Sequence, residues 1–169
     1  MQQSKRRNRT GNSFTSSQVA VDPIDRKILA ELSKSPRTSV AGLSKRIGMS
    51  RPAVAERIRR LEESSVIAGW TVQLNPVSLG LPLTVVIRIR PMPRQLATVA
   101  DLLRSMPWVV ECLRITGEDC YLARAHVPSV SALEQLIDRI QPYGQTTTSV
   151  VQSTPVPFRQ PPLPGPVSP

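Results

Sequence analysis

Residues 48–63 read GMSRPAVAERIRRLEE. Gly48 is suited to end one helix, and the hydroxyl of Ser50 is suited to cap the start of the next. From Val54 onward, apolar residues recur at i, i+4 and i+7, which gives the second helix one buried stripe. Two helices joined by so short a turn, the second of them rich in arginine, are typical of a helix-turn-helix that places its second helix in the major groove of DNA.

The residues before this stretch supply the supporting helices. Asp22 and Pro23 form a helix start, because the carboxylate caps free backbone donors and proline is tolerated in the first turn. Apolar residues follow at helical spacing, and a second short helix is expected after Ser39. A three-helix DNA-binding domain is therefore predicted over residues 22–74, with the alternating segment 70–74 as a wing or a connecting strand.

The outer face of the helix that begins after Ser50 is the expected reading surface. Arg51, Ala55 and Arg59 are expected near base edges. The full set of candidate DNA-binding residues is Thr38, Ser39, Ser50, Arg51, Pro52, Ala55, Arg57, Arg59 and Arg60. Of these, phosphate contacts are expected from Thr38, Ser39, Arg57 and Arg60. The alternative interpretation is a solvated helix face on which Glu56, Glu62 or Glu63 pairs with the arginines.

The distribution of charge also indicates that the DNA-binding surface lies in the first half of the chain. The sequence has 22 Lys and Arg against 12 Asp and Glu, a formal net charge of +10. Residues 1–80 hold 14 of the basic residues and 6 of the acidic ones, so the surface that binds an anionic partner is expected there. Residues 1–21 form a basic arm, expected to be disordered, that either contacts DNA or only keeps the end soluble.

Composition excludes several other classes of protein. Two cysteines and one histidine cannot fill a structural zinc site, and aromatic residues make up only 4% of the chain, which disfavours an aromatic platform for single strands. No apolar run reaches the roughly 18 residues of a membrane-spanning helix, and no apolar signal-peptide core follows the basic cluster. We expect no metal, no cofactor, and a cytoplasmic, nucleoid-associated location.

The second half of the chain alternates between strand-like and helix-like patterns. Strands are expected over residues 83–90, 109–116, 120–126 and 146 to about 154, with one helix opening at Pro93 and another marked by apolar residues from Val130 to Ile140. The order β-α-β-β-α-β is the ferredoxin-like arrangement, so the fold class is α+β. The expected domains are a linker at 75–82, a ferredoxin-like domain at 83–154 and a disordered, Pro-rich tail at 155–169.

Both helices of such a domain cover the same face of its sheet, and the other face needs a partner. A homodimer is the expected answer. It also suits a helix-turn-helix, because two reading helices related by a two-fold axis address two half-sites of double-stranded DNA.

The loop between the second and third strands is the candidate effector site. It places a glycine beside two carboxylates, which suit a ligand ammonium group, although a tight hairpin explains the same residues. The run at 146–148 adds hydroxyls, although β-propensity alone explains it. The candidate effector-binding residues are Thr116, Gly117, Glu118, Asp119, Cys120, Thr146 and Thr148. His126 is interpreted as structural and Cys112 as a small apolar filler, and since no nucleophile has a base beside it, the chain is not expected to be an enzyme.

With these residues in view, the chain resembles the Lrp/AsnC (feast/famine) family of transcription regulators over about residues 22–154. The matching stretches are DPIDRKIL at 22–29, GMS at 48–50, Val54, RI at 57–58, RLEE at 60–63, VI at 66–67, GE at 117–118 and YL at 121–122. The resemblance implies a winged helix-turn-helix joined to a ferredoxin-like ligand-sensing domain. It also implies dimers that assemble further, up to octamers, and a small-molecule effector, typically an amino acid, bound between sensing domains.

Three positions depart from the family pattern. Ser65 stands where the family usually has glycine, Ser44 where it usually has alanine, and Cys120 where it often has aspartate. The expected function is a sequence-specific DNA-binding transcriptional regulator modulated by an effector. Two alternatives stay open on the sequence alone: an enzyme of the same two-domain plan, similar to sirohaem decarboxylases, and a nucleoid-associated architectural protein of low sequence specificity.

Overall fold

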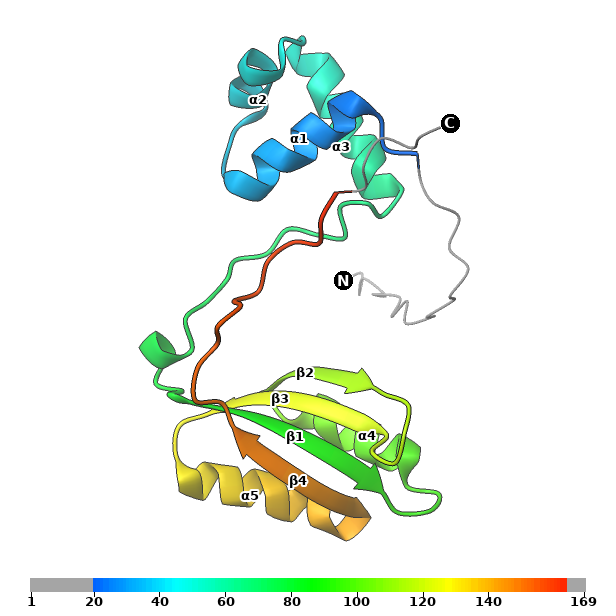
Figure 1. The fold of residues 1–169 in the computed structure, drawn as a ribbon, viewed down its shortest axis with the longest axis vertical. Helices are drawn as coiled ribbons and strands as arrows, with labels where there is room; N and C mark the ends of the chain where they lie inside the picture. Colours follow the sequence, from blue (N-terminus) through cyan, green and yellow to red (C-terminus); the bar gives the residue numbers. More distant parts are fainter. Residues whose placement is uncertain (1–19, 164–169) are drawn as a thin grey trace, which may run out of the picture. The chain divides into compact units, whose positions relative to one another are not determined.

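The computed structural model describes residues 20–163, which fall into two compact units. The first is built mainly from residues up to Thr71, and the second spans Val72–Phe158. Figure 1 shows the first unit as a group of helices and the second as a sheet covered by helices. Residues 1–19 of the expected basic arm and residues 164–169 of the expected tail lie outside the described residues.

The three predicted helices of the first unit are present as α1 (Pro23–Lys34), α2 (Val40–Ile47) and α3 (Arg51–Glu63). Their starts are local in origin. The Asp22 carboxylate accepts the N–H groups of Ile24 and Asp25, both at 2.8 Å. Ser39 and Ser50 cap α2 and α3 in the same manner, since each hydroxyl accepts an N–H from the first turn.

One fully buried side chain from each helix forms the centre of this unit. Ile28, Leu43 and Val54 are 0%, 1% and 0% exposed. The remaining buried apolar residues of the cluster are Leu29, Leu32 and Leu61. The short connection between α2 and α3 is possible because Gly48, at φ 76°, adopts the left-handed conformation that a side chain disfavours.

The wing or connecting strand expected after α3 is not present as a strand. Between Glu63 and Leu83, all of them described residues, the structure contains no strand and only the short helix η1 (Val77–Leu79). The alternating Trp70 and Leu74 are 54% and 65% exposed. Alternation gives a segment two faces, but a strand also needs a ladder of backbone hydrogen bonds to a neighbour. The segment is therefore extended chain.

The second unit has the predicted ferredoxin-like order. Its elements are β1 (Leu83–Pro91), α4 (Leu96–Ser105), β2 (Val109–Arg114), β3 (Tyr121–Val127), α5 (Val130–Ile140), η2 (Gln141–Tyr143) and β4 (Gly144–Val150). The strands lie in the order β2-β3-β1-β4, and each neighbouring pair is antiparallel. The prediction of an α+β fold with this topology is confirmed.

Two expected boundaries in this unit differ from the structure by more than the one or two residues seen at the other ends. The first helix starts at Leu96 and not at Pro93, because Arg94 has φ 68°, outside the right-handed helical region. The last strand ends at Val150 and not near Thr154, although the N–H of Val151 still donates to the carbonyl of Thr84 at 2.9 Å.

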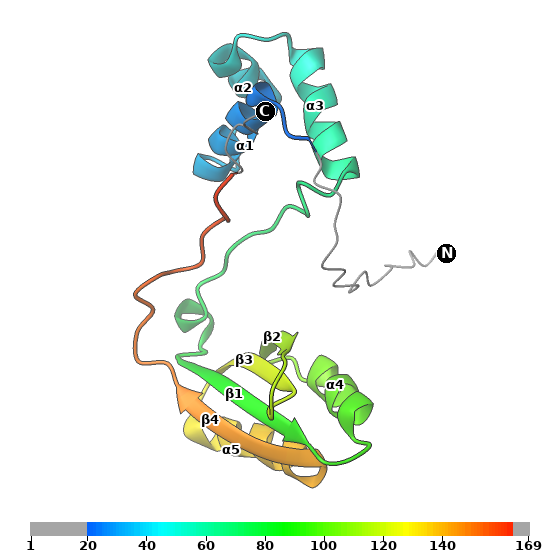
Figure 2. The same ribbon diagram turned by 45° about the vertical axis from the view of Figure 1, so that its right-hand side comes forward.

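The two faces of the sheet differ in character. On one face, Val85, Ile87 and Ile89 of β1 are fully buried and share a core with residues of α4 and α5. Figure 2 shows both helices on this side. We call the opposite side the helix-free face. It is formed in the central strands by Thr84, Val86, Arg88 and Arg90 of β1 and by Leu122, Arg124 and His126 of β3.

No helix in the described part of the chain combines the length and the apolar character that a membrane crossing requires.

Candidate nucleic-acid interface and effector loop

The outward side of α3 is an exposed ridge. Val54 and Leu61 turn inward and are buried. Arg51, Ala55 and Arg59 lie on the outside, as do the neighbouring candidates Ser50 and Pro52. Because these positions recur about every fourth residue, they form one face of the helix, as a reading surface for a groove requires.

The turn between α2 and α3 adds backbone donors to one end of this ridge. The start of an α-helix exposes N–H groups and the positive end of its dipole, both of which favour a phosphate. The candidates Ser39 and Ser50 are the exposed caps of α2 and α3, and Thr38 is partly buried just before α2. Arg51 forms no ion pair with any residue that the structure describes, and its cation is exposed.

Arg59 is held by two carboxylates on the same helix. Its Nε donates to Oε2 of Glu56 at 2.9 Å, its Nη2 donates to Oε1 of Glu56 at 2.5 Å, and its Nη1 donates to Glu63. These hydrogen bonds raise the pKa of Arg59 and lower that of Glu56. All three side chains are more than half exposed, so water and salt weaken these pairs.

Arg57 was expected to contact a DNA phosphate, but in this structure it is paired with two carboxylates. Its Nη1 donates to Asp22 at 2.5 Å and to Asp25 at 2.7 Å, and its side chain is only 19% exposed. The hydrogen bonds to both carboxylates raise the pKa of Arg57. The pKa of Asp22 is lowered, first by the N–H of Asp25 and then by Arg57. In this structure Arg57 joins α3 to α1, a role that the sequence interpretation missed.

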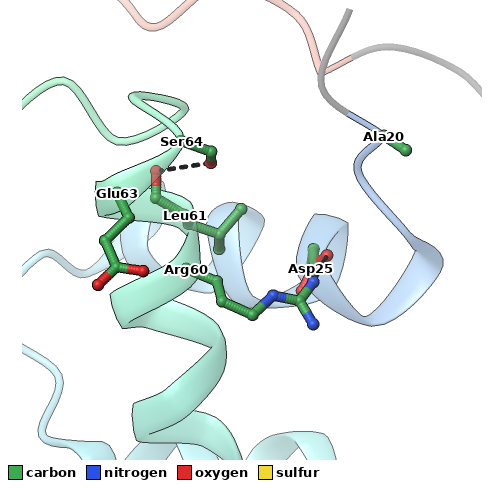
Figure 3. A pocket seen from close by; sticks show the side chains of 6 residues that line it. All are labelled: Ala20, Asp25, Arg60, Leu61, Glu63 and Ser64. Atoms are coloured by element: carbon green, nitrogen blue, oxygen red, sulfur yellow. Dashed lines mark hydrogen bonds and ion pairs between the residues drawn. The ribbon is translucent and has the colours of Figure 1, made fainter.

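Arg60 turns toward the same acidic residue but stays exposed. Its Nη2 lies 3.8 Å from Oδ2 of Asp25, and its side chain is 56% exposed. Figure 3 shows the Arg60 side chain extending toward Asp25, and both residues line a cavity of about 370 Å³. The cavity is lined by Ala20, Asp25, Arg60, Leu61, Glu63 and Ser64. Arg60 is therefore beside the exposed ridge, where a phosphate can still reach it.

The candidate effector loop connects β2 to β3 and ends on the helix-free face. Gly117 has φ 106°, and the N–H of Ile115 donates to the carbonyl of Cys120 at 2.9 Å, which closes the turn. The carboxylate of Glu118 lies 3.4 Å from Arg90, and that of Asp119 lies 3.7 Å from Arg88. The loop thus brings two carboxylates beside two strand arginines at one end of the sheet. Thr116 is exposed and Cys120 partly buried.

The two candidate threonines lie on the other side of the sheet. Thr146 and Thr148 pair with Ile89 and Ile87, so their side chains point to the face that α4 and α5 cover. The Oγ1 of Thr148 is buried without a hydrogen-bond partner among the described residues. The structure therefore does not bring these hydroxyls to the loop carboxylates within one chain.

The lone histidine occupies the helix-free face. Its Nδ1 lies 2.9 Å from Oγ1 of Thr84. Burial lowers the pKa of His126, and the neighbouring charge of Arg124 lowers it further. Both cysteines are free, and burial raises the pKa of Cys112. Among the described residues, no group of three or more His, Cys, Asp or Glu side chains is placed to hold a metal ion.

Comparison with known proteins decides the family. Residues 21–62 match the family model of the AsnC-type helix-turn-helix domain, and residues 84–161 match that of the Lrp/AsnC ligand binding domain. The HTH-type transcriptional regulator LrpC of Bacillus subtilis is 32% identical over 135 residues, which cover 80% of this chain and 94% of that protein. This chain belongs to the Lrp/AsnC family. The resemblance seen in the sequence is confirmed.

Other members of the Lrp/AsnC family agree with this assignment. The leucine-responsive regulatory protein of Escherichia coli (strain K12) is 36% identical over 138 residues, covering 78% of this chain and 84% of that protein. A feast or famine regulatory protein of Mycobacterium tuberculosis, solved in complex with L-methionine, is 33% identical with a TM-score of 0.77, covering 83% of this chain and 98% of that one. These relatives are regulators, so the prediction of a DNA-binding transcriptional regulator and not an enzyme is confirmed.

Proposed function

We propose that this Lrp/AsnC-family chain is a sequence-specific regulator that binds double-stranded DNA as a homodimer. The observation that carries the proposal is the exposed ridge of α3, with Arg51, Ala55 and Arg59 on one helix face. A helix fits the major groove, and arginine is the residue that most often reads guanine there. Ser50 and Pro52 lie at the start of the ridge, Arg60 lies on the same helix, and Thr38 and Ser39 lie at the start of α2. We assign these residues to the backbone phosphates that flank a helix in the groove.

Arg57 belongs to this proposal only indirectly. Its guanidinium is occupied by Asp22 and Asp25, so it contributes by holding α3 against the start of α1. A phosphate contact from Arg57 would require it to leave a partner that is almost fully buried, since the Asp25 side chain is 2% exposed.

We further propose that a small molecule, an amino acid or a related metabolite, binds at the loop Thr116–Cys120 between sensing domains. Two relatives support this class of ligand. The M. tuberculosis regulator was solved with L-methionine, as was a transcriptional regulator of Neisseria meningitidis that is 25% identical with a TM-score of 0.75. The loop itself offers carboxylates for an ammonium group and lies beside arginines suited to a carboxylate. Such a regulator works in the cytoplasm, where the DNA is.

The test of DNA recognition is selection of duplexes from a randomised pool by the purified full-length chain. A sequence-specific regulator enriches a defined site, and its Arg51→Ala variant loses preference for that site about tenfold relative to random duplex. Equal weakening on selected and random duplexes contradicts a base-reading role for Arg51. A flat sequence profile for the unaltered chain, with a steep dependence on salt, favours the architectural alternative.

A further inference from the structure

The exposed ridge of α3 carries negatively charged side chains, which are unfavourable on a surface that binds DNA. Glu56 and Glu63 lie on the same helix as Arg59, and their side chains are 53% and 58% exposed. A carboxylate near the phosphates lowers affinity for every DNA sequence, because it repels the backbone. Its presence on the ridge therefore calls for a compensating role. We name the group formed by Glu56, Arg59 and Glu63 the Arg59 clamp.

The geometry of the Arg59 clamp leaves a defined part of the guanidinium free. An arginine side chain has five N–H donors: one on Nε and two on each terminal nitrogen. Glu56 accepts from Nε and Nη2, and Glu63 accepts from Nη1. One N–H therefore remains on each terminal nitrogen. Guanine offers two neighbouring acceptors, O6 and N7, in the major groove, one for each of these N–H groups.

We propose that Glu56, assisted by Glu63, is a specificity-determining positioning residue of α3. It holds the guanidinium of Arg59 so that the remaining pair of N–H groups meets a guanine, and it keeps that cation from pairing with a phosphate instead. This inference rests on the proposed function, in which α3 enters the major groove. The inference gives an acidic residue, Glu56, a role in recognition. The net charge of the chain alone would predict a recognition surface made of basic residues.

The physical reason is a competition between two ways of using one cation. A free arginine has many rotamers and binds any phosphate within reach, which raises affinity for random and selected duplexes alike. A clamped arginine gives up part of that affinity. Because its orientation is already fixed, it loses less rotamer freedom when it meets the one base edge that fits. Arg51, which has no ion pair with a described residue, lacks this restriction.

The experiment compares Glu56→Gln with a matched control on the same helix. Glu62→Gln removes the same charge, but Glu62 accepts a hydrogen bond from the indole N–H of Trp70 at 2.6 Å and does not contact Arg59 in the structure. A duplex is first selected from a randomised pool by the full-length chain. Dissociation constants are then measured on that duplex, on its single-base variants and on random duplex, for both glutamine variants and for Arg59→Ala.

We expect the preference of Glu56→Gln for guanine at one position of the selected duplex to fall about tenfold. Arg59→Ala abolishes the preference at the same position. Affinity for random duplex rises in Glu56→Gln. Glu62→Gln raises affinity for all duplexes by one common factor and leaves the base preference unchanged. Replacing the guanine by 7-deazaguanine, which lacks the N7 acceptor, weakens the unaltered chain but has little effect on Glu56→Gln. A simple effect of charge would not produce this difference.

The contrary results distinguish a failure of this inference from a failure of the proposed function. If Arg59→Ala loses the guanine and Glu56→Gln keeps it, Glu56 does not position Arg59 and the inference is overturned, while the base-reading function stands. If Arg59→Ala leaves the profile unchanged, Arg59 reads no base and the inference is overturned as well. If the unaltered chain selects no sequence, the proposed specific function fails together with it.

Discussion

Nη1 of Arg57 on α3 donates to Oδ1 of Asp25 on α1 at 2.7 Å. The Asp25 side chain is 2% exposed, and a carboxylate buried to that extent is costly unless a cation and hydrogen bonds compensate it. The same nitrogen also contacts Asp22, the cap of α1. The start of the first helix and the middle of the reading helix are therefore fixed to each other by charge as well as by apolar packing.

Arg57→Met should destabilise the helical unit. The substitution keeps an extended, apolar side chain but leaves the buried Asp25 carboxylate with only the exposed Arg60, at 3.8 Å, as a cation. Breaking a buried pair on one side costs about 3 kcal/mol, a large share of the stability of a small domain. Urea unfolding followed by helical circular dichroism measures the change. Arg46→Met is the control, since it removes an exposed pair with Glu31 and should cost about 1 kcal/mol or less. Equal effects of the two substitutions would contradict a structural role for the Arg57 pair.

Asp22 should make the stability of this unit sensitive to acid. The pKa of Asp22 is lowered in the folded chain by the N–H of Asp25 and by Arg57. Its contribution is therefore fully present above the ordinary pKa of aspartate, and it is lost as the pH falls through the lowered folded value. Asp22→Asn keeps a capping oxygen but cannot titrate. Unfolding free energies measured between about pH 7 and about pH 3 should fall less steeply for Asp22→Asn than for the unaltered chain. Parallel curves would rule out this contribution.

Ser65→Gly should stabilise the end of α3. Ser65 has φ 60°, the left-handed conformation that glycine adopts at no steric cost. A side chain there costs about 1–2 kcal/mol, partly offset by the greater freedom of glycine in the unfolded chain, so we expect a gain of about 0.5–1 kcal/mol. Thermal unfolding measures it. Ser64→Gly is the matched control, because Ser64 has φ −78° and the same exchange there should destabilise. A Ser65→Gly variant no more stable than the original chain would show that the turn relaxes around serine.

The helices of the first unit could be predicted because their signals are local. Asp22, Ser39 and Ser50 each bond to an N–H two or three residues later, so spacing alone identifies them. The partners of Arg57 could not be predicted this way. Asp25 lies 32 residues before it, and reading along a helix finds only pairs three or four residues apart. The Glu56 and Glu63 pairs with Arg59 are of that local kind, and the alternative interpretation of this helix face named them.

The candidate effector site could be predicted from the sequence only in part, for a different reason. The loop at 116–120 was identified from Gly117 and its carboxylates, but the face on which Thr146 and Thr148 lie was not. Three consecutive threonines give no apolar alternation, so nothing in the run tells which of them points to the core. Only the register with β1, in which Thr148 pairs with the buried Ile87, assigns them to the helix-covered side. Arg88 and Arg90 were missed as neighbours of the loop for the same reason, since strand order places them there.

Glu118→Gln should weaken binding of an amino-acid effector. Under the proposed function, the loop carboxylates hold the ligand ammonium group, and an amide at position 118 removes one charge while keeping the shape. Isothermal titration with each proteinogenic amino acid identifies the ligand of the unaltered chain, and the variant should bind it about tenfold more weakly. Glu134→Gln, on the exposed side of α5, is the control of equal charge. An unchanged affinity in Glu118→Gln would place the ammonium group elsewhere.

Under the proposed homodimer, Val86→Lys should weaken self-association of the chain. Val86 lies in the middle of the helix-free face, opposite Arg124 on β3 and two residues before Arg88 on β1. In a two-fold dimer through this face, one substitution enters the interface twice, and each new cation meets arginines without a new carboxylate. The dimer dissociation constant, measured by sedimentation equilibrium, should therefore rise about tenfold or more. Gln135→Lys on the exposed side of α5 adds the same charge away from this face and should sediment like the original chain. If Val86→Lys also does so, the copies meet through another surface.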